Sequence, residues 1–280
     1  MKKINFLVFG LALLFLASAA SFAQTASNIV KKDLSPAEID NIIKKMTQNE
    51  EDFRYALSNY VFTRKATIQT VGLGGQITGT FRRDSFLTFN EDGQRFERIL
   101  FAPTSTLSEI RVTPEDIEDL GGINPFALRP SEVPLYNFNF LGKERIDELD
   151  LYVFDVAPKI MPNPKKSSQR LFQGRIWVDD RDLMIVKSRG KAVPDSKDNK
   201  FPVVETWREN VDGKYWFPAY SSSDDELVFD SGQVVRLKMR VSYADYAQGR
   251  TSVKVLGDEE VVQDDQPPSK DQPPPPPKKP

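Results

Sequence analysis

Ten segments of the chain have the composition and spacing of β-strands, and most alternate apolar and polar residues with a period of two. The clearest is residues 235–243, where Val, Leu, Met, Val and Tyr alternate with Arg, Lys, Arg and Ser. The first begins at residue 60 and ends near a Gly-rich turn at residues 72–75. The remaining eight occupy residues 76–90, 94–101, 135–140, 151–156, 171–178, 183–192, 201–210 and 215–222.

Most of these segments are joined by short turns, and no helices alternate with them, so a parallel sheet built from βαβ units is not expected. The predicted fold class is mainly β (α+β), with a single large antiparallel sheet of about ten strands. A sheet that wide curls rather than staying flat. We therefore expect a curved half-barrel with one polar face.

A long helix is predicted over residues 35–59, in front of the first strand. Ser35 is a good N-cap, Pro36 suits the first helical position, and Glu38 completes a capping box. An apolar stripe recurs at helical spacing at Ile39, Ile42, Ile43, Met46, Phe53 and Leu57. A second, short helix is predicted over residues 115–120. Both are expected on the concave face, which they are too few to cover completely.

The N-terminus has the pattern of a secretory signal peptide. Lys2 and Lys3 precede an apolar run at residues 4–16, and small residues then lead to a cleavage site between Ala23 and Gln24. The run is about 13 residues, short of the roughly 20 needed to cross a bilayer, so a membrane-spanning anchor is not expected. The prediction is an exported protein, in the periplasm or, as the alternative, secreted.

Composition divides the chain into four parts: a signal peptide at residues 1–23, a flexible segment at 24–34, a half-barrel binding domain at 35–256 and a tail at 257–280. The tail is acidic and then Pro-rich, with five consecutive prolines at residues 273–277, and is expected to be disordered. It is interpreted as a solubilising tail. The alternative is a docking peptide for an envelope protein.

The chain contains no Cys and no His, which removes several kinds of chemistry. A Ser-His-Asp triad, a Cys nucleophile and a zinc site of the usual type all need one or the other. The net charge of −2 does not favour binding to nucleic acid. Acidic clusters at residues 179–182 and 224–226 do not match a calcium loop and are interpreted as turns. No enzyme activity, cofactor or metal is predicted, and a carboxylate-based hydrolase is the least favoured alternative.

Large apolar side chains on the predicted strands form the candidate binding site. A concave sheet beneath a helical lid is a common geometry for an apolar pocket. The competing interpretation is ordinary core beneath the long helix. The predicted groove residues are Phe138, Phe140, Tyr152, Phe154, Trp177, Trp207 and Met239.

One hairpin carries a family resemblance. Residues 171–179 read Leu-Phe-Gln-Gly-Arg-Ile-Trp-Val-Asp, and residues 183–187 read Leu-Met-Ile-Val-Lys. This resembles the G-x-I-W-V-D … L-x-I-V-K hairpin of outer-membrane lipoprotein-sorting-like proteins, in the periplasmic lipoprotein-carrier (LolA-like) superfamily. The resemblance covers about residues 35 to 247.

The resemblance implies a half-barrel whose helices act as a lid, and a non-enzymatic role in binding acyl chains of lipids or lipoproteins. The Arg that holds the lid in the characteristic carrier has no match that can be identified here. Because the superfamily also contains regulatory sensors, the alternative is a cell-envelope interaction or sensor module that docks through its Pro-rich tail.

Overall fold

The computed structural model describes residues 28–90, 94–114, 116, 128–167, 169–197 and 199–249. The predicted signal peptide and tail lie outside these residues. The short helix predicted at residues 115–120 also lies almost entirely outside them, although Pro114 and Asp116 are helical.

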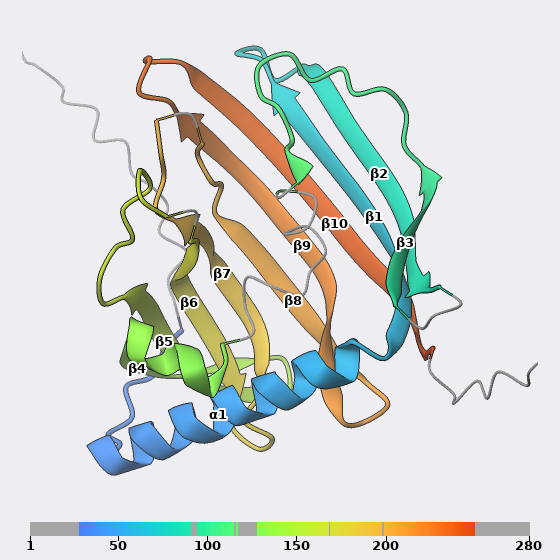
Figure 1. The fold of residues 1–280 in the computed structure, drawn as a ribbon. Helices are drawn as coiled ribbons and strands as arrows, with labels where there is room; N and C mark the ends of the chain where they lie inside the picture. Colours follow the sequence, from blue (N-terminus) through green and yellow to red (C-terminus); the bar gives the residue numbers. More distant parts are fainter. Residues whose placement is uncertain are drawn as a thin grey trace, which may run out of the picture.

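Within the described residues, ten strands form one antiparallel sheet that curves into an open half-barrel (Figure 1), which confirms the predicted fold class. The strands are β1 (Tyr60–Val71), β2 (Ile77–Phe89), β3 (Arg95–Phe101), β4 (Tyr136–Ile146), β5 (Leu149–Pro158), β6 (Leu171–Asp179), β7 (Ile185–Val193), β8 (Val204–Val211), β9 (Tyr215–Val228) and β10 (Val234–Gln248). Their order across the sheet is β3-β2-β1-β10-β9-β8-β7-β6-β5-β4, so the first strand pairs with the last.

One of the two acidic clusters differs from its interpretation as a turn. Residues 224–226 lie inside β9, where Glu226 pairs with Arg236 across the sheet at 2.7 Å and Asp224 lies 3.6 Å from Lys238. These cross-strand pairs explain why polar residues continue the strand. The cluster at 179–182 is a turn, in which Asp179 accepts hydrogen bonds from the backbone N–H groups of Arg181 and Asp182.

The long helix α1 (Pro36–Leu57) lies across one end of the concave face (Figure 1). It begins at the predicted capping box, since Glu38 donates its backbone N–H to the Ser35 hydroxyl at 3.3 Å and its carboxylate accepts the Ser35 N–H at 2.8 Å. The short 3₁₀ helix η1 (Pro130–Leu135) packs beside it.

The concave face beneath α1 is a solid core in two clusters. One joins Phe53 and Leu57 of α1 to Phe62 and Phe217 of the sheet. The other joins the first half of α1 to β4–β7 through Met46, Phe154 and Ile176, among others. A smaller cluster of Leu151, Val153, Trp177 and Val186 covers part of the opposite, convex face. Because the sheet is filled from the concave side at this end, α1 closes one end of the half-barrel.

A buried ion pair anchors α1 to the sheet. The Glu50 carboxylate, fully buried, accepts hydrogen bonds from Arg208 Nη1 at 2.9 Å and from the Ile185 N–H at 3.0 Å. Burial raises the pKa of Glu50 above its usual range, and Arg208 offsets only part of that rise. The Arg208 guanidinium also lies 4.9 Å from the centre of the Phe53 ring. The pair therefore connects α1 to both β7 and β8.

Candidate functional site

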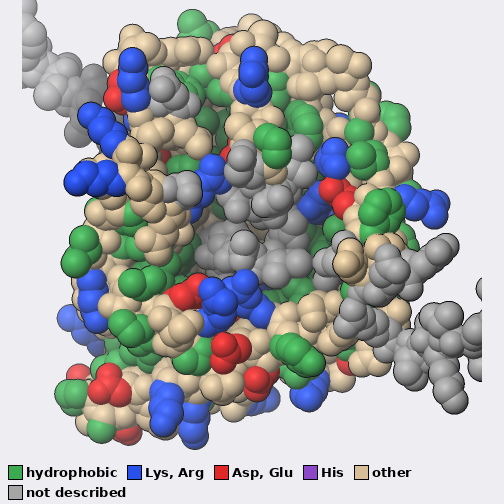
Figure 2. Space-filling model, in the orientation of Figure 1, with side chains coloured by type: hydrophobic (Ala, Val, Ile, Leu, Met, Phe, Trp, Pro, Cys, Tyr) green, Lys and Arg blue, Asp and Glu red, His purple; other side chains and the backbone are tan. Residues whose placement is uncertain are grey.

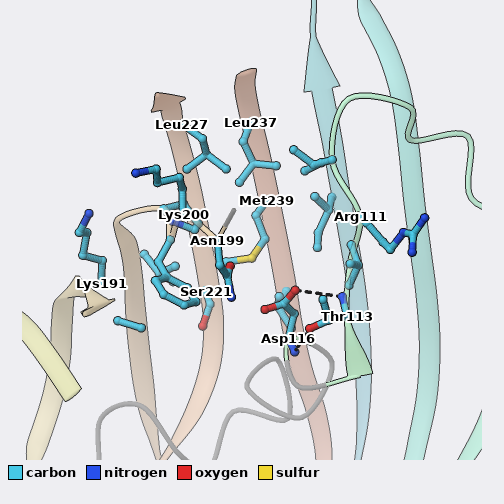
Figure 3. Close-up of a pocket in the computed structure, with 18 of the residues that line it drawn as sticks. Arg111, Thr113, Asp116, Lys191, Asn199, Lys200, Ser221, Leu227, Leu237 and Met239 are labelled. Carbon is cyan, nitrogen blue, oxygen red and sulfur yellow. Dashed lines mark hydrogen bonds between the residues drawn. The ribbon is translucent and has the colours of Figure 1, made fainter. Parts of the chain in front are cut away.

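A cavity of about 680 Å³ lies against the concave face where β8, β9, β10 and β1 run side by side (Figure 3). Among the described residues, those of α1 contribute nothing to its lining, although the sheet wall of the cavity continues the buried cluster that contains Phe53 and Phe217. Its volume is within the range of small-molecule sites, roughly 300–1,000 Å³.

The wall formed by the sheet follows from strand periodicity. Successive side chains of β10 point to opposite faces, so Leu237, Met239 and Val241 reach the cavity while Lys238 and Arg240 are exposed on the convex side. Leu227 of β9 continues the same wall (Figure 3). The alternation that predicts these strands therefore also makes the wall apolar.

Among the residues that the structure describes, two loop segments cover the cavity. Ile110 and Val112 come from the segment after β3, and Phe201 and Pro202 come from the segment before β8. The second segment is held by a hydrogen bond from the Val203 N–H to the carboxylate of Asp225, at 2.8 Å.

The segment after β3 is held at both ends. The Thr106 N–H donates to the Thr80 carbonyl at 3.0 Å. At the other end Thr113 and Asp116 exchange hydrogen bonds, each from its backbone N–H to the side chain of the other (Figure 3). Both covers are thus tied to the rest of the chain by hydrogen bonds and ion pairs, which include Thr78–Glu109 and Lys200–Asp230.

The polar groups that line the cavity are largely satisfied. Thr206 and Ser221 share a hydrogen bond of 2.8 Å between their hydroxyls. Lys191 pairs with Asp195 at 2.7 Å, and Lys200 pairs with Asp230 at 2.8 Å. These pairings leave an interior suited to an uncharged, apolar ligand group.

A charged cluster around the buried Arg64 adjoins the cavity beside Tyr243, one of its lining residues. Arg64, opposite Tyr243 on β1, lies 2.6 Å from Glu97, which also binds Arg83 and Ser85. Hydrogen bonds from Arg83 and Ser85, together with the charge of Arg64, lower the pKa of Glu97 to about 2. Burial raises the pKa of Tyr243 to about 12, so this phenol is neutral at ordinary pH.

The structure places the predicted groove residues in three locations. Met239 lines the cavity. Phe138, Phe140, Tyr152 and Phe154 pack in or against the cluster beneath α1, with the rings of Phe140 and Phe154 centred 5.2 Å apart. Trp177 and Trp207 lie on the convex face with Lys187 between them, 4.8 and 4.1 Å from the two ring centres. Only Met239 is therefore brought to the cavity.

Sequence reasoning missed the residues that cover the cavity. Ile110, Phe201 and Phe229 lie outside or at the ends of the strands, where no periodicity marks them. The available signal was that large apolar side chains interrupt otherwise polar connecting segments. Trp177 shares its strand face with the polar residues Gln173 and Arg175. This pattern was the available signal that Trp177 does not lie in an apolar groove.

In the part of the chain that the structure describes, no group of three or more His, Cys, Asp or Glu side chains could hold a metal ion. The same residues include no helix that is long and apolar enough to cross a membrane.

Together, the curved antiparallel sheet, the helix at one end and the covered apolar cavity define an open half-barrel with a covered concave face. No family model matches the chain. No curated protein matches it either.

Solved structures of similar fold include a LolA superfamily protein from Nitrosomonas europaea, with 15% identity over 76% of this chain and 93% of that chain and a TM-score of 0.34. Another is a DUF1329 family protein from Desulfovibrio piger, with 13% identity, coverage of 76% and 94%, and a TM-score of 0.35. A third is an outer membrane lipoprotein-sorting protein domain from Vibrio parahaemolyticus, with 12% identity, coverage of 72% and 93%, and a TM-score of 0.33. The first and third of these structures bear the names of the groups that the hairpin motif resembles.

Proposed function

We propose that the chain is an exported, non-enzymatic binding protein whose cavity holds an acyl chain of a lipid or lipoprotein. The observation that carries the proposal is the apolar cavity itself, walled by Leu227, Leu237 and Met239 and covered by Phe201. An acyl chain in such a space gains about 0.8 kcal/mol for each methylene removed from water. Export to the periplasm rests on the signal-peptide pattern of residues 1–23.

The polar groups support binding rather than hydrolysis. Two carboxylates line the cavity, Glu109 and Asp116, and each already accepts a hydrogen bond, from Thr78 at 2.7 Å and from Thr113 at 2.9 Å. The cavity therefore offers apolar contact and little that would activate water.

Displacement of a fluorescent fatty acid tests the proposal directly. Val204 lines the cavity and is half-buried, so Val204→Trp fills part of the space while leaving the strand intact. If the indole excludes two methylenes, binding weakens about fifteenfold. The matched control is Val228→Trp, because Val228 is 59% exposed and is not among the cavity-lining residues.

Native mass spectrometry of the purified chain provides the second measurement. We expect a bound lipid in the unsubstituted chain and in Val228→Trp, and a reduced amount in Val204→Trp. Equal affinity of the two Trp variants for the fatty acid would show that the ligand does not occupy this cavity.

A further inference from the structure

Four connections form the rim of the half-barrel at the end opposite α1: residues 72–76, 159–170, 194–203 and 229–233. In Figure 1 the β1–β2 and β9–β10 turns lie at the top and α1 at the bottom. We call the four connections at the end opposite α1 the rim. Its residues Phe201 and Phe229 also line the cavity, so the cavity extends to this end of the molecule.

The rim exposes large apolar side chains at the tips of its turns. Leu73 is 98% exposed, Ile160 is 82% exposed and Met161 is 49% exposed. Val228 and Val234, which flank the β9–β10 turn, are 59% and 50% exposed. Single exposed apolar residues are ordinary on a surface, but several on the turns at one end of the sheet are consistent with an interaction site.

The rim connection that exposes Ile160 and Met161 is also basic. Residues 159–170 contain three Lys and one Arg and no Asp or Glu. Lys159, Lys165 and Lys166 are exposed, and they form no ion pair with any of the residues that the structure describes. Figure 2 shows Lys and Arg side chains gathered along the upper left margin of the molecule. Ile160 and Met161 thus share their connection with three lysines whose side chains form no ion pair with the described residues.

The opposite end of the sheet has the reverse charge. The turns beside α1 carry Asp147, Glu148, Asp180, Asp182 and Asp212. The same turns carry two cations, Arg181 and Lys214, so acidic residues are in excess at this end. A molecule with one basic and one acidic end is oriented by a charged surface before it makes contact.

We infer that the rim docks on the surface of an anionic lipid bilayer. Lysines that flank an apolar tip are suited to such a surface, because they attract anionic headgroups while the tip enters the interface. The docked orientation puts the cavity beside the bilayer and α1 away from it. This orientation gives an acyl chain a short path between membrane and cavity, a consequence that rests on the proposed function, whereas the docking itself does not.

The chemistry of the rim favours a bilayer over other occupants. Its apolar tips belong to separate turns, at residues 73 and 160, and project as points rather than lining a groove for a peptide. A second copy whose 159–170 connection faced this one would bring Lys159, Lys165 and Lys166 against the same three lysines, which repel one another. A fluid surface of anionic headgroups accommodates both the separate tips and the lysines.

Flotation with lipid vesicles tests the inference, using the chain from Gln24 onward, the form that the proposed cleavage leaves. Vesicles of phosphatidylglycerol in phosphatidylcholine are compared with vesicles of phosphatidylcholine alone. We expect binding to the anionic vesicles and its loss at high salt. The triple variant Lys159→Gln, Lys165→Gln, Lys166→Gln should weaken binding about a hundredfold at low salt.

The matched charge control is Lys44→Gln, Lys45→Gln, Lys214→Gln, which makes the same change in net charge at exposed positions near α1. It should bind vesicles like the unsubstituted chain. Leu73→Ser with Ile160→Ser tests the apolar tips and should weaken binding about tenfold. Its control is Tyr55→Ser, since Tyr55 is 78% exposed on α1.

Insertion of residue 160 into the bilayer can be measured separately. Because the chain contains no Cys, a single introduced Cys can be labelled with a dye. An environment-sensitive dye attached to Ile160→Cys should shift to the blue on anionic vesicles, and the same dye on Tyr55→Cys should not. Equal loss of flotation in the two lysine variants would overturn the docking orientation, and an unshifted dye at residue 160 in floated protein would overturn insertion. Fatty-acid displacement without vesicles reports on the cavity separately, so failure of one proposal is distinguishable from failure of the other.

Discussion

The buried pair of Glu50 and Arg208 gives the sharpest test of how α1 is held to the sheet. The substitution Arg208→Met removes the cation and keeps an apolar side chain of similar length near Phe53. Glu50 then retains only the Ile185 N–H among the partners described above. Removing one partner of a buried pair costs about 3–5 kcal/mol, because the remaining charge is uncompensated.

The loss should depend on pH in a defined direction. Burial already holds the pKa of Glu50 above its usual range, so the folded chain binds this proton more readily than the unfolded chain. Stability therefore falls as pH rises through the raised pKa. Without Arg208 the pKa of Glu50 rises further, and the variant loses more stability than the native chain between acid and neutral pH.

Urea unfolding followed by tryptophan fluorescence measures this difference at neutral pH and near pH about 4, close to the ordinary carboxyl pKa. We expect a deficit of about 3–5 kcal/mol at neutral pH that shrinks to about 1–2 kcal/mol in acid, where Glu50 is protonated. The double variant Glu50→Leu, Arg208→Met should recover to within about 1 kcal/mol of the native chain. A deficit of equal size at both pH values, left unchanged in the double variant, would refute the electrostatic reasoning and point to lost packing.

Two further predictions concern Glu97 and Ser35. Since the pKa of Glu97 is lowered to about 2 by Arg83 and its neighbours, the stability that this carboxylate contributes should disappear as pH falls from about 4.5 toward 2. Acid unfolding of Glu97→Gln should lack that component, and an unchanged acid profile would contradict it. Ser35→Ala breaks the capping box of α1 and should cost about 1 kcal/mol in urea unfolding, whereas Ser35→Asp should cost little.

The strands could be predicted because each has a consistently buried face. On β10 the residues of one face pack in the core or cavity and those of the other are exposed, so the period of two is clear in the sequence. The ends of the strands are harder to predict from the sequence. β9 continues through Asp224 and Glu226 because β10 supplies Lys238 and Arg236 opposite them, and cross-strand partners cannot be read from one segment alone.

The cavity could be predicted only in outline. A wide curled sheet with few helices implies an incompletely covered concave face, and Met239 was identified as a groove residue. Phe138 alternates with polar residues as Met239 does, but it packs against the cluster beneath α1 rather than lining the cavity. Which part of the concave face α1 fills depends on the Glu50–Arg208 contact, between residues 158 positions apart.

The pairing of β1 with β10 has a consequence for how the chain reaches this structure. Tyr60 lies opposite Gln248, 188 residues later in the sequence, so β1 to β3 are synthesised long before the strand that joins them to the rest of the sheet. Strands β4 to β9 can pair with sequence neighbours as they emerge, but contacts between distant residues form slowly. Until β10 is in place, β1 and β9 both expose unpaired edges of the kind that recruit other chains. The last strand therefore closes the middle of the sheet rather than an edge, and the time before it forms is when this chain is most open to aggregation.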